Sequence, residues 1–289
     1  MLNIGLIGKL TSIEKQIDKL KKYPDIRIQG KSSVGTKSQP TDYRFSIPEY
    51  NRIELIERSD AILLEDSSLI PYSLIKDSVK RRKHIFFLEY PDFDEDQCQE
   101  LIKLIEEAGT TVQIKNPLYF NSSVQYMVHH TTTPFYLKVE ILKKLSETQN
   151  NRILWDITLL ILKMGQHLPQ KIKTIHTDHP ENIFKFRNIR LEYSDSSVLE
   201  LNLIFSDNDE KFLMEAISRN DIFELNLVSN QISAKSGPVN TKGFEVIKEY
   251  ESFFKSVIKK QMPFTGINDY MTVLKTLEKI NAKINIASL

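Results

Sequence analysis

The first 120 residues alternate short apolar runs with segments of helical periodicity. The apolar runs, each of strand length, lie at residues 3–7, 26–28, 61–64, 84–88 and 111–114. The segments with helical spacing of apolar positions lie at residues 12–22, 53–58, 73–83 and 94–108. Strands that are apolar throughout are buried on both faces, so this alternation predicts a parallel sheet covered by helices on both sides. Right-handed crossovers between such strands give a Rossmann-like α/β domain over residues 1–120.

Two connections in this domain bear on function. Gly8 follows the first strand and is predicted to open a turn before the first helix. Residues 30–48 contain glycine, serine, threonine and two prolines, and they are predicted to form a long loop after the second strand.

Residues 121–289 show the pattern of strands and helices that is typical of an α+β domain. Apolar and polar positions alternate in residues 190–205 and 211–234, and helical segments are predicted at residues 122–166, 243–260 and 268–285. The alternation, as in Leu199-Glu200-Leu201-Asn202-Leu203, is typical of strands with one face in solvent. We therefore expect a largely antiparallel open sheet. The pattern also leaves open that the last helices pack on the first domain.

The charge balance argues against nucleic acid and membranes as partners. Lys and Arg number 39 against 38 Asp and Glu, so the net charge is +1 and no global field attracts polyanions. The local basic runs at residues 19–22 and 80–83 fall at the ends of predicted helices, where cations complement the helix dipole. No stretch approaches the 18 or so apolar residues that a membrane span needs.

The single cysteine, Cys98, excludes an internal disulfide and suits a reducing compartment. It lies in a helical run with no histidine at motif spacing, which favours a structural thiol. The start of the chain is apolar but short, and it lacks a basic segment and a cleavage site, so no signal peptide is predicted. The expected location is the cytoplasm.

Four segments together resemble the glucose–fructose oxidoreductase, inositol dehydrogenase and MocA (Gfo/Idh/MocA) family. They are Ser59-Asp60-Ala61-Ile62-Leu63-Leu64, the strand Lys83 to Pro91 with its Glu-Tyr-Pro end, the helix Asp94 to Gly109, and the closing run Tyr250 to Phe264. The resemblance extends in order over nearly the whole chain. It implies NAD or NADP on the first domain and a small-molecule ligand in a cleft between the domains. It also implies homodimers or homotetramers formed through the open sheet of the second domain.

The glycine fingerprint for a dinucleotide is incomplete in this chain. The segment reads Gly8-Lys9-Leu10-Thr11-Ser12-Ile13, so only the first glycine of the motif is present. A side chain at Leu10 stands where the pyrophosphate approaches the backbone. The hydroxyl groups of Thr11 and Ser12, with the helix N-terminus, could still hold an anion. The alternative is a plain strand-to-helix turn with a serine or threonine as N-cap.

The ribose position lacks the acid typical of NAD enzymes. The segment after the second predicted strand reads Gln29-Gly30-Lys31-Ser32-Ser33. Lys31 with Ser32 and Ser33 favours NADP over NAD if a cofactor binds. The alternative is an exposed loop.

Two carboxylates follow the third strand, where the family has small residues. Glu65 and Asp66 near a pyrophosphate would repel it at a cost of about 1 kcal/mol each. Alternatively, Ser67 and Ser68 cap the next helix and the two acids point to water.

The resemblance also locates the reacting groups, and two of them differ here. Where the family has Glu-Lys-Pro, with a lysine that assists proton transfer, this chain has Glu89-Tyr90-Pro91. Tyr90 can donate a proton, but with an ordinary pKa near 10 it is a poor base. Where the family has an aspartate and, four residues on, a histidine, the chain keeps Asp156 but has Leu160. His167, further along, is predicted to be an exposed loop histidine.

Three hypotheses remain open from the sequence. The first is a divergent oxidoreductase that holds cofactor with Gly8, Thr11, Ser12, Lys31, Ser32, Glu89 and Pro91, with Tyr90 as proton donor and Asp156 orienting the substrate. The second is a non-catalytic ligand-binding or regulatory relative that partners an active paralogue. The third is a reductase of a conjugated substrate, because the Glu-Tyr-Pro triplet and the missing histidine are similar to biliverdin reductases. No metal is expected, because the pairs His129-His130 and His176-Thr177-Asp178-His179 lack the spacing of a metal site.

Overall fold

The computed structural model describes the chain in segments separated by short gaps. The described residues are 1–34, 47–131, 136–143, 147–165, 168–177, 185–205, 210–239, 241 and 243–287. Contacts divide the chain into two compact units. The first contains Met1–Lys115 and Glu249–Met271, and the second contains Asn116–Lys248 and Thr272–Leu289.

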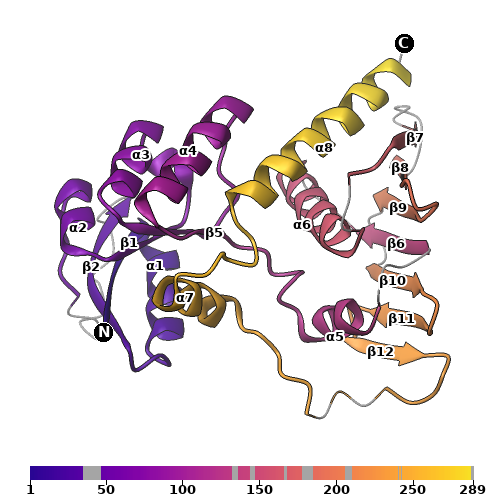
Figure 1. The fold of residues 1–289 in the computed structure, drawn as a ribbon, viewed down its shortest axis with the longest axis horizontal. Coiled ribbons are helices and arrows are strands. Elements are labelled where there is room, and N and C mark those ends of the chain that lie inside the picture. Colours follow the sequence, from indigo (N-terminus) through magenta and orange to yellow (C-terminus); the bar gives the residue numbers. More distant parts are fainter. Residues whose placement is uncertain are drawn as a thin grey trace. The chain divides into compact units, whose positions relative to one another are not determined.

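The first unit is built on a five-stranded sheet of order β2-β1-β3-β4-β5 (Figure 1). Its strands are β1 (Leu2–Lys9), β2 (Ile26–Val34), β3 (Ala61–Leu64), β4 (His84–Phe87) and β5 (Val112–Ile114). Every pair is parallel, as the continuous apolar runs predicted. The Rossmann-like fold class is therefore confirmed.

Helices cover both faces of this sheet. The helices of the first unit are α1 (Leu10–Leu20), α2 (Arg52–Arg58), α3 (Tyr72–Lys80), α4 (Glu95–Ala108) and α7 (Glu249–Lys259), with a short 3-10 turn η1 at Ser67–Leu69. The apolar sides of α1 and α7 pack together on one face of the sheet, and α3 and α4 pack against each other on the other face (Figure 1). Residues from the end of the chain thus complete the core of its beginning.

The two connections that matter for function differ from the prediction. β1 continues through Gly8 to Lys9, and α1 begins at the next residue, so the predicted turn at Gly8 is wrong. β2 continues to Val34, so the predicted loop from residue 30 is also wrong over its first residues. The cause is strand pairing: β1 and β2 stay in register to their ends, where Gly8 pairs with Ser33.

The second unit contains a seven-stranded sheet of order β12-β11-β10-β6-β9-β8-β7. Its strands are β6 (Tyr136–Lys143), β7 (Lys171–Thr177), β8 (Lys185–Glu192), β9 (Val198–Phe205), β10 (Lys211–Ile217), β11 (Ile222–Asn226) and β12 (Gln231–Ala234). All pairs are antiparallel except β6 with β9, so the expectation of a largely antiparallel sheet is confirmed.

In the part of the chain that the structure describes, the helices of the second unit pack against one face of this sheet and leave the other open (Figure 1). They are α5 (Ser122–His130), α6 (Glu147–Gly165) and most of α8 (Ile267–Ala287). Strand β6 lies where the sequence predicted helix, which is a correction. Its residues alternate, and Leu137, Val139 and Ile141 join the core beneath α6 while the side chains between them face away.

Cys98 is a buried free thiol, as predicted. Burial raises its pKa to about 12, with Asp94 and Glu95 adding to the shift. The thiolate, which is the reactive form, is therefore suppressed at neutral pH.

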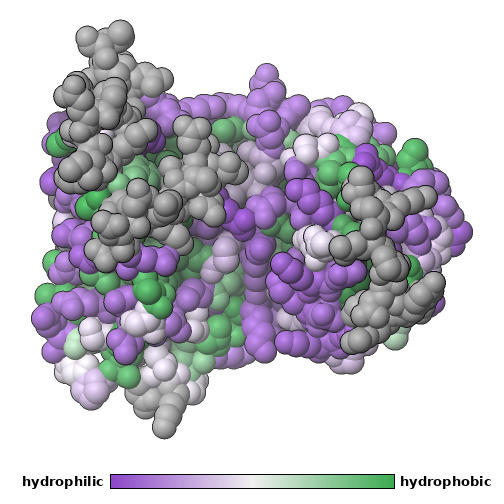
Figure 2. All heavy atoms as spheres, turned by 180° about the vertical axis from the view of Figure 1, so that it is seen from behind, coloured by the Kyte–Doolittle hydropathy of each residue, from purple (hydrophilic) through white to green (hydrophobic). Residues whose placement is uncertain are grey.

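Among the described residues, no helix is both long and apolar enough to span a membrane. Hydrophilic residues cover most of the molecular face in Figure 2, and hydrophobic ones appear between them in small groups.

Candidate functional site

The candidate site lies where β1, β2 and β3 end, because ligands of parallel α/β sheets bind outside the carboxyl ends of the strands. β1 passes directly into α1 with Lys9 as the N-cap residue, and the Lys9 side chain makes no capping bond. Thr11 and Ser12 lie inside the first turn of α1, with Thr11 exposed. Neither is the N-cap, so the alternative of a serine or threonine cap is wrong.

The carboxylate of Glu65 occupies the start of α1. The backbone N–H of Lys9 donates to Oε2 of Glu65 at 2.5 Å, and the backbone N–H of Glu65 donates to the carbonyl oxygen of Ile7 at 2.9 Å. Glu65 therefore accepts a hydrogen bond from the N-cap amide, as the glutamate of a capping box does. A capping-box glutamate lies in the helix itself, whereas Glu65 directly follows β3. A negative charge at this position also complements the helix dipole.

Gly8 provides the room for this carboxylate. A Cβ atom added to Gly8 would lie 2.8 Å from the Cβ of Glu65 and closer still to its carboxylate. The first glycine of the expected fingerprint thus accommodates a protein side chain. The idea that both acids point to water is wrong for Glu65, and Asp66 caps η1 by accepting from the N–H of Ser68 at 2.8 Å.

A second carboxylate lies at the end of β2. Glu49 accepts from the backbone N–H of Ser33 at 2.7 Å and from its hydroxyl at 2.5 Å. The Nζ of Lys31 lies 3.8 Å from the other oxygen of Glu49. Lys31, the buried Ser32 and Ser33 all lie within β2, so the exposed-loop alternative for them is wrong.

The Glu89-Tyr90-Pro91 segment follows β4 and contacts the start of α8. The ring of Tyr90 stacks on Tyr270 with centroids 6.5 Å apart, and the hydroxyl of Tyr270 donates to the carbonyl oxygen of Pro91. Glu89 and Tyr90 are half-buried, and Pro91 is buried. Burial raises the pKa of Tyr270, which keeps its hydroxyl protonated as the donor. The sequence did not identify Tyr270, because it lies far along the chain from Tyr90.

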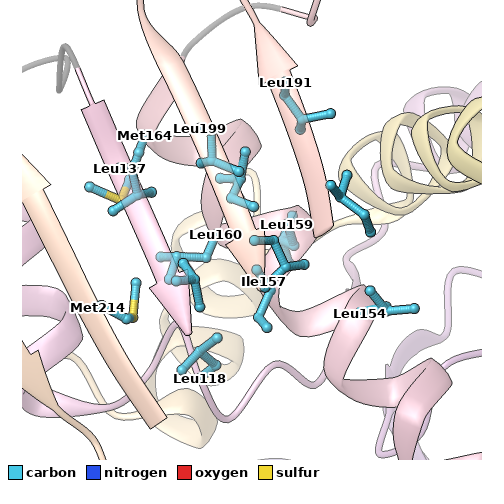
Figure 3. Close-up of a cluster of buried hydrophobic side chains, with 14 of the residues drawn as sticks. Leu118, Leu137, Leu154, Ile157, Leu159, Leu160, Met164, Leu191, Leu199 and Met214 are labelled. Atoms are coloured by element: carbon cyan, nitrogen blue, oxygen red, sulfur yellow. The ribbon is translucent and has the colours of Figure 1, made fainter. Parts of the chain in front are cut away.

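Asp156 and Leu160 lie on α6, in the second unit. Asp156 is 7% exposed and Leu160 is completely buried. Figure 3 shows Leu160 between Leu137 and Ile157, within the cluster that joins α6 to the sheet. The position that the resemblance assigned to a catalytic histidine is therefore core. His167 lies outside the described residues.

The comparisons with known proteins bear on the fold. No protein-family profile matches the sequence, and no curated protein is significantly similar to it. A UDP-N-acetylglucosamine 3-dehydrogenase from Acidithiobacillus ferrooxidans matches 98% of this chain and 97% of its own at 12% identity, with a TM-score of 0.78. A dehydrogenase from Chromobacterium violaceum matches 99% and 96% at 13% identity, with a TM-score of 0.80. The biliverdin reductase of Synechocystis sp. PCC 6803, solved with biliverdin and NADP+, matches 98% of each chain at 9% identity, with a TM-score of 0.68.

The chain has the fold of the Gfo/Idh/MocA dehydrogenases. At such low identity the likeness extends to the fold alone, and the chemistry must be judged from the residues. The resemblance noted in the sequence is thereby confirmed at the level of architecture.

The residues at the strand ends do not fit the pyrophosphate of a dinucleotide. That group needs free amide N–H donors, a glycine turn and a backbone without side chains. Here the turn is missing, Leu10 replaces the second glycine, and Glu65 accepts the hydrogen bond of the N-cap amide. Within the described part of the chain, no group of three His, Cys, Asp or Glu side chains is placed to hold a metal ion.

Proposed function

We propose that this chain is a dehydrogenase-fold protein without dehydrogenase activity, which acts as a ligand-binding or regulatory relative of an active enzyme. The observation that carries the proposal is the bond from the Lys9 amide to the carboxylate of Glu65. A pyrophosphate placed there would lose this donor and meet a like charge at close range, which is unfavourable.

The reacting positions support the same proposal. Leu160 offers no proton acceptor and is surrounded by apolar side chains. Tyr90 offers a phenol, and its ring stacks on Tyr270. General base catalysis near neutral pH needs a group with a pKa near the working pH, such as a histidine or a tuned lysine.

The buried free thiol of Cys98 suits the cytoplasmic location that we propose.

The proposal is tested by calorimetric titration of the purified chain with NADPH and NADH. We expect no saturable heat of binding up to millimolar cofactor, in protein shown to be folded by circular dichroism. Micromolar binding of either cofactor would contradict the proposal.

A reductase remains the second candidate, because Lys31 and Ser33 form a donor pair at the end of β2. In that case NADP would be preferred, Tyr90 would donate the proton, and Asp156 would orient a small-molecule or conjugated substrate. Tight binding of NADPH but not NADH, weakened by Lys31→Ala, would favour this candidate. Loss of turnover in Tyr90→Phe would then assign the proton donor.

We further propose a homodimer formed through the open face of the second sheet. One row of paired side chains crosses this face from β11 to β7, in the order Glu224, Glu215, Lys138, Glu200, Arg190 and Lys173. The row is acidic at one side and basic at the other. A twofold axis parallel to the strands, between β6 and β9, sets opposite charges face to face at three positions. The pairs are Lys138 with Glu200, Glu215 with Arg190, and Glu224 with Lys173.

The size of the particle in solution tests this dimer. We expect analytical ultracentrifugation to find a dimer that dissociates in Arg190→Glu, because that change sets like charges against each other across the axis. The double variant Arg190→Glu with Glu215→Arg should restore it, since the charges are exchanged between the same two positions. A wild-type monomer at all concentrations, or a dimer indifferent to the single change, would refute the arrangement.

A further inference from the structure

We infer that Glu65 and Glu49 are internal ligands: two carboxylates of the chain itself occupy the anion positions at the ends of β1 and β2. The inference rests on the proposed function, and deepens it by naming what fills the site.

Glu65 meets the requirements of a bound anion. It lies against the N-terminus of α1, an 11-residue helix, and accepts the hydrogen bond of the N-cap amide. Such a position attracts anions through its amide donors and the helix dipole. The missing side chain of Gly8 allows its close approach. The same two features, an amide donor and a glycine, serve phosphate groups in dinucleotide sites.

Glu49 meets the requirements of a bound anion at the end of the neighbouring strand, β2. Its carboxylate accepts two hydrogen bonds, from the amide and the hydroxyl of Ser33, and forms an ion pair with the ammonium group of Lys31 at 3.8 Å. Hydrogen bonds to a carboxylate from such donors are stronger than those between neutral groups.

The backbone fixes Glu49 in place. Lys31 donates its N–H to the carbonyl oxygen of Pro48 at 2.9 Å, and its carbonyl oxygen accepts from the N–H of Tyr50 at 2.9 Å. The segment that returns to the sheet therefore pairs with β2 on both sides of Glu49.

The two carboxylates belong to one edge of the sheet. Gly8, which contacts Glu65, pairs directly with Ser33, which bonds Glu49. At this edge, the amide of Lys9 bonds Glu65, and Ser33 and Lys31 contact Glu49. The partners of all three groups are therefore carboxylates of the protein itself. Removing both carboxylates leaves these donors clustered without acidic partners, and an external anion should then bind.

The test is calorimetry with inorganic pyrophosphate as the probe. We expect the double variant Glu65→Ala with Glu49→Ala to bind pyrophosphate at least about tenfold more tightly than the wild-type protein. The matched control is Glu106→Ala with Glu107→Ala, which removes two exposed acids of α4 and changes the net charge equally. The control should bind no better than the wild type.

A second pair of variants covers the case in which the alanine protein does not fold. Glu65→Gln with Glu49→Gln keeps the shape and removes both charges, and hydrogen exchange of the Lys9 amide reports whether the capping bond persists. We expect faster exchange at Lys9 and tighter pyrophosphate binding than in the control. Folded variants that bind no better than the control would overturn the inference. That failure is distinct from failure of the proposed function, which shows as NADPH or NADH binding to the wild-type protein.

Discussion

Replacing Leu160 by alanine is expected to lower the free energy of unfolding by about 2–5 kcal/mol. The side chain is completely buried in the cluster that joins α6 to the second sheet (Figure 3), so its removal leaves a cavity. Urea unfolding followed by the fluorescence of Trp155, the single tryptophan, measures the change in the same helix. The matched control is Leu168→Ala, at a leucine that is 51% exposed, which should change stability by no more than about 0.5 kcal/mol.

Leu160→His is a second test of the burial of residue 160. It introduces the histidine that the family resemblance implies at this position. A buried imidazole without a partner costs free energy, so we expect a loss at least as large as that of the alanine variant. A stable histidine variant with an imidazole that titrates normally would mean that residue 160 faces solvent, and would contradict the core assignment.

Replacing Phe253 by alanine is expected to cost about 3–5 kcal/mol in the first unit. Phe253 is completely buried, and its ring stacks on Phe86 of β4 with centroids 5.1 Å apart. The contact attaches α7, which lies late in the chain, to the sheet formed by its first 115 residues. Denaturant unfolding monitored by far-ultraviolet circular dichroism measures the loss.

Ile258→Ala provides the control on the same helix, since Ile258 is 64% exposed and should contribute little. Equal effects of the two changes would show that α7 does not pack on the sheet through Phe253. A large effect of Phe253→Ala alone supports the assignment of residues 249–271 to the first unit.

The sheet of the first unit could be predicted because its strands are apolar on both faces, as in the run Ala61–Leu64. The strand β6 was missed because its alternating pattern is short and lies between two helices. The end of β2 was missed for a different reason. Lys31, Ser32 and Ser33 are typical of loops, and they remain in the strand because β1 pairs with them and Glu49 bonds two of them.

The candidate site was predicted in part. The sequence singled out Gly8 and the two acids Glu65 and Asp66, and the structure places Gly8 in β1 and the acids directly after β3. The sequence could not show that Glu65 bonds the Lys9 amide, because 56 residues separate them and strand register decides the contact. The same holds for Tyr90 and Tyr270. Local patterns predict elements, whereas side chains that meet across strands depend on tertiary structure.

An amide NMR titration of the isotope-labelled chain with NADPH tests directly whether Glu65 and Glu49 exclude the cofactor. The resonances of Lys9 and Ser33 report on the two carboxylate-bonded positions. We expect both resonances to stay unchanged up to millimolar NADPH, because Glu65 and Glu49 already accept their hydrogen bonds. Saturable shifts of both amides would place the cofactor's phosphates at this edge of the sheet and contradict the proposal that carboxylates of the chain occupy it.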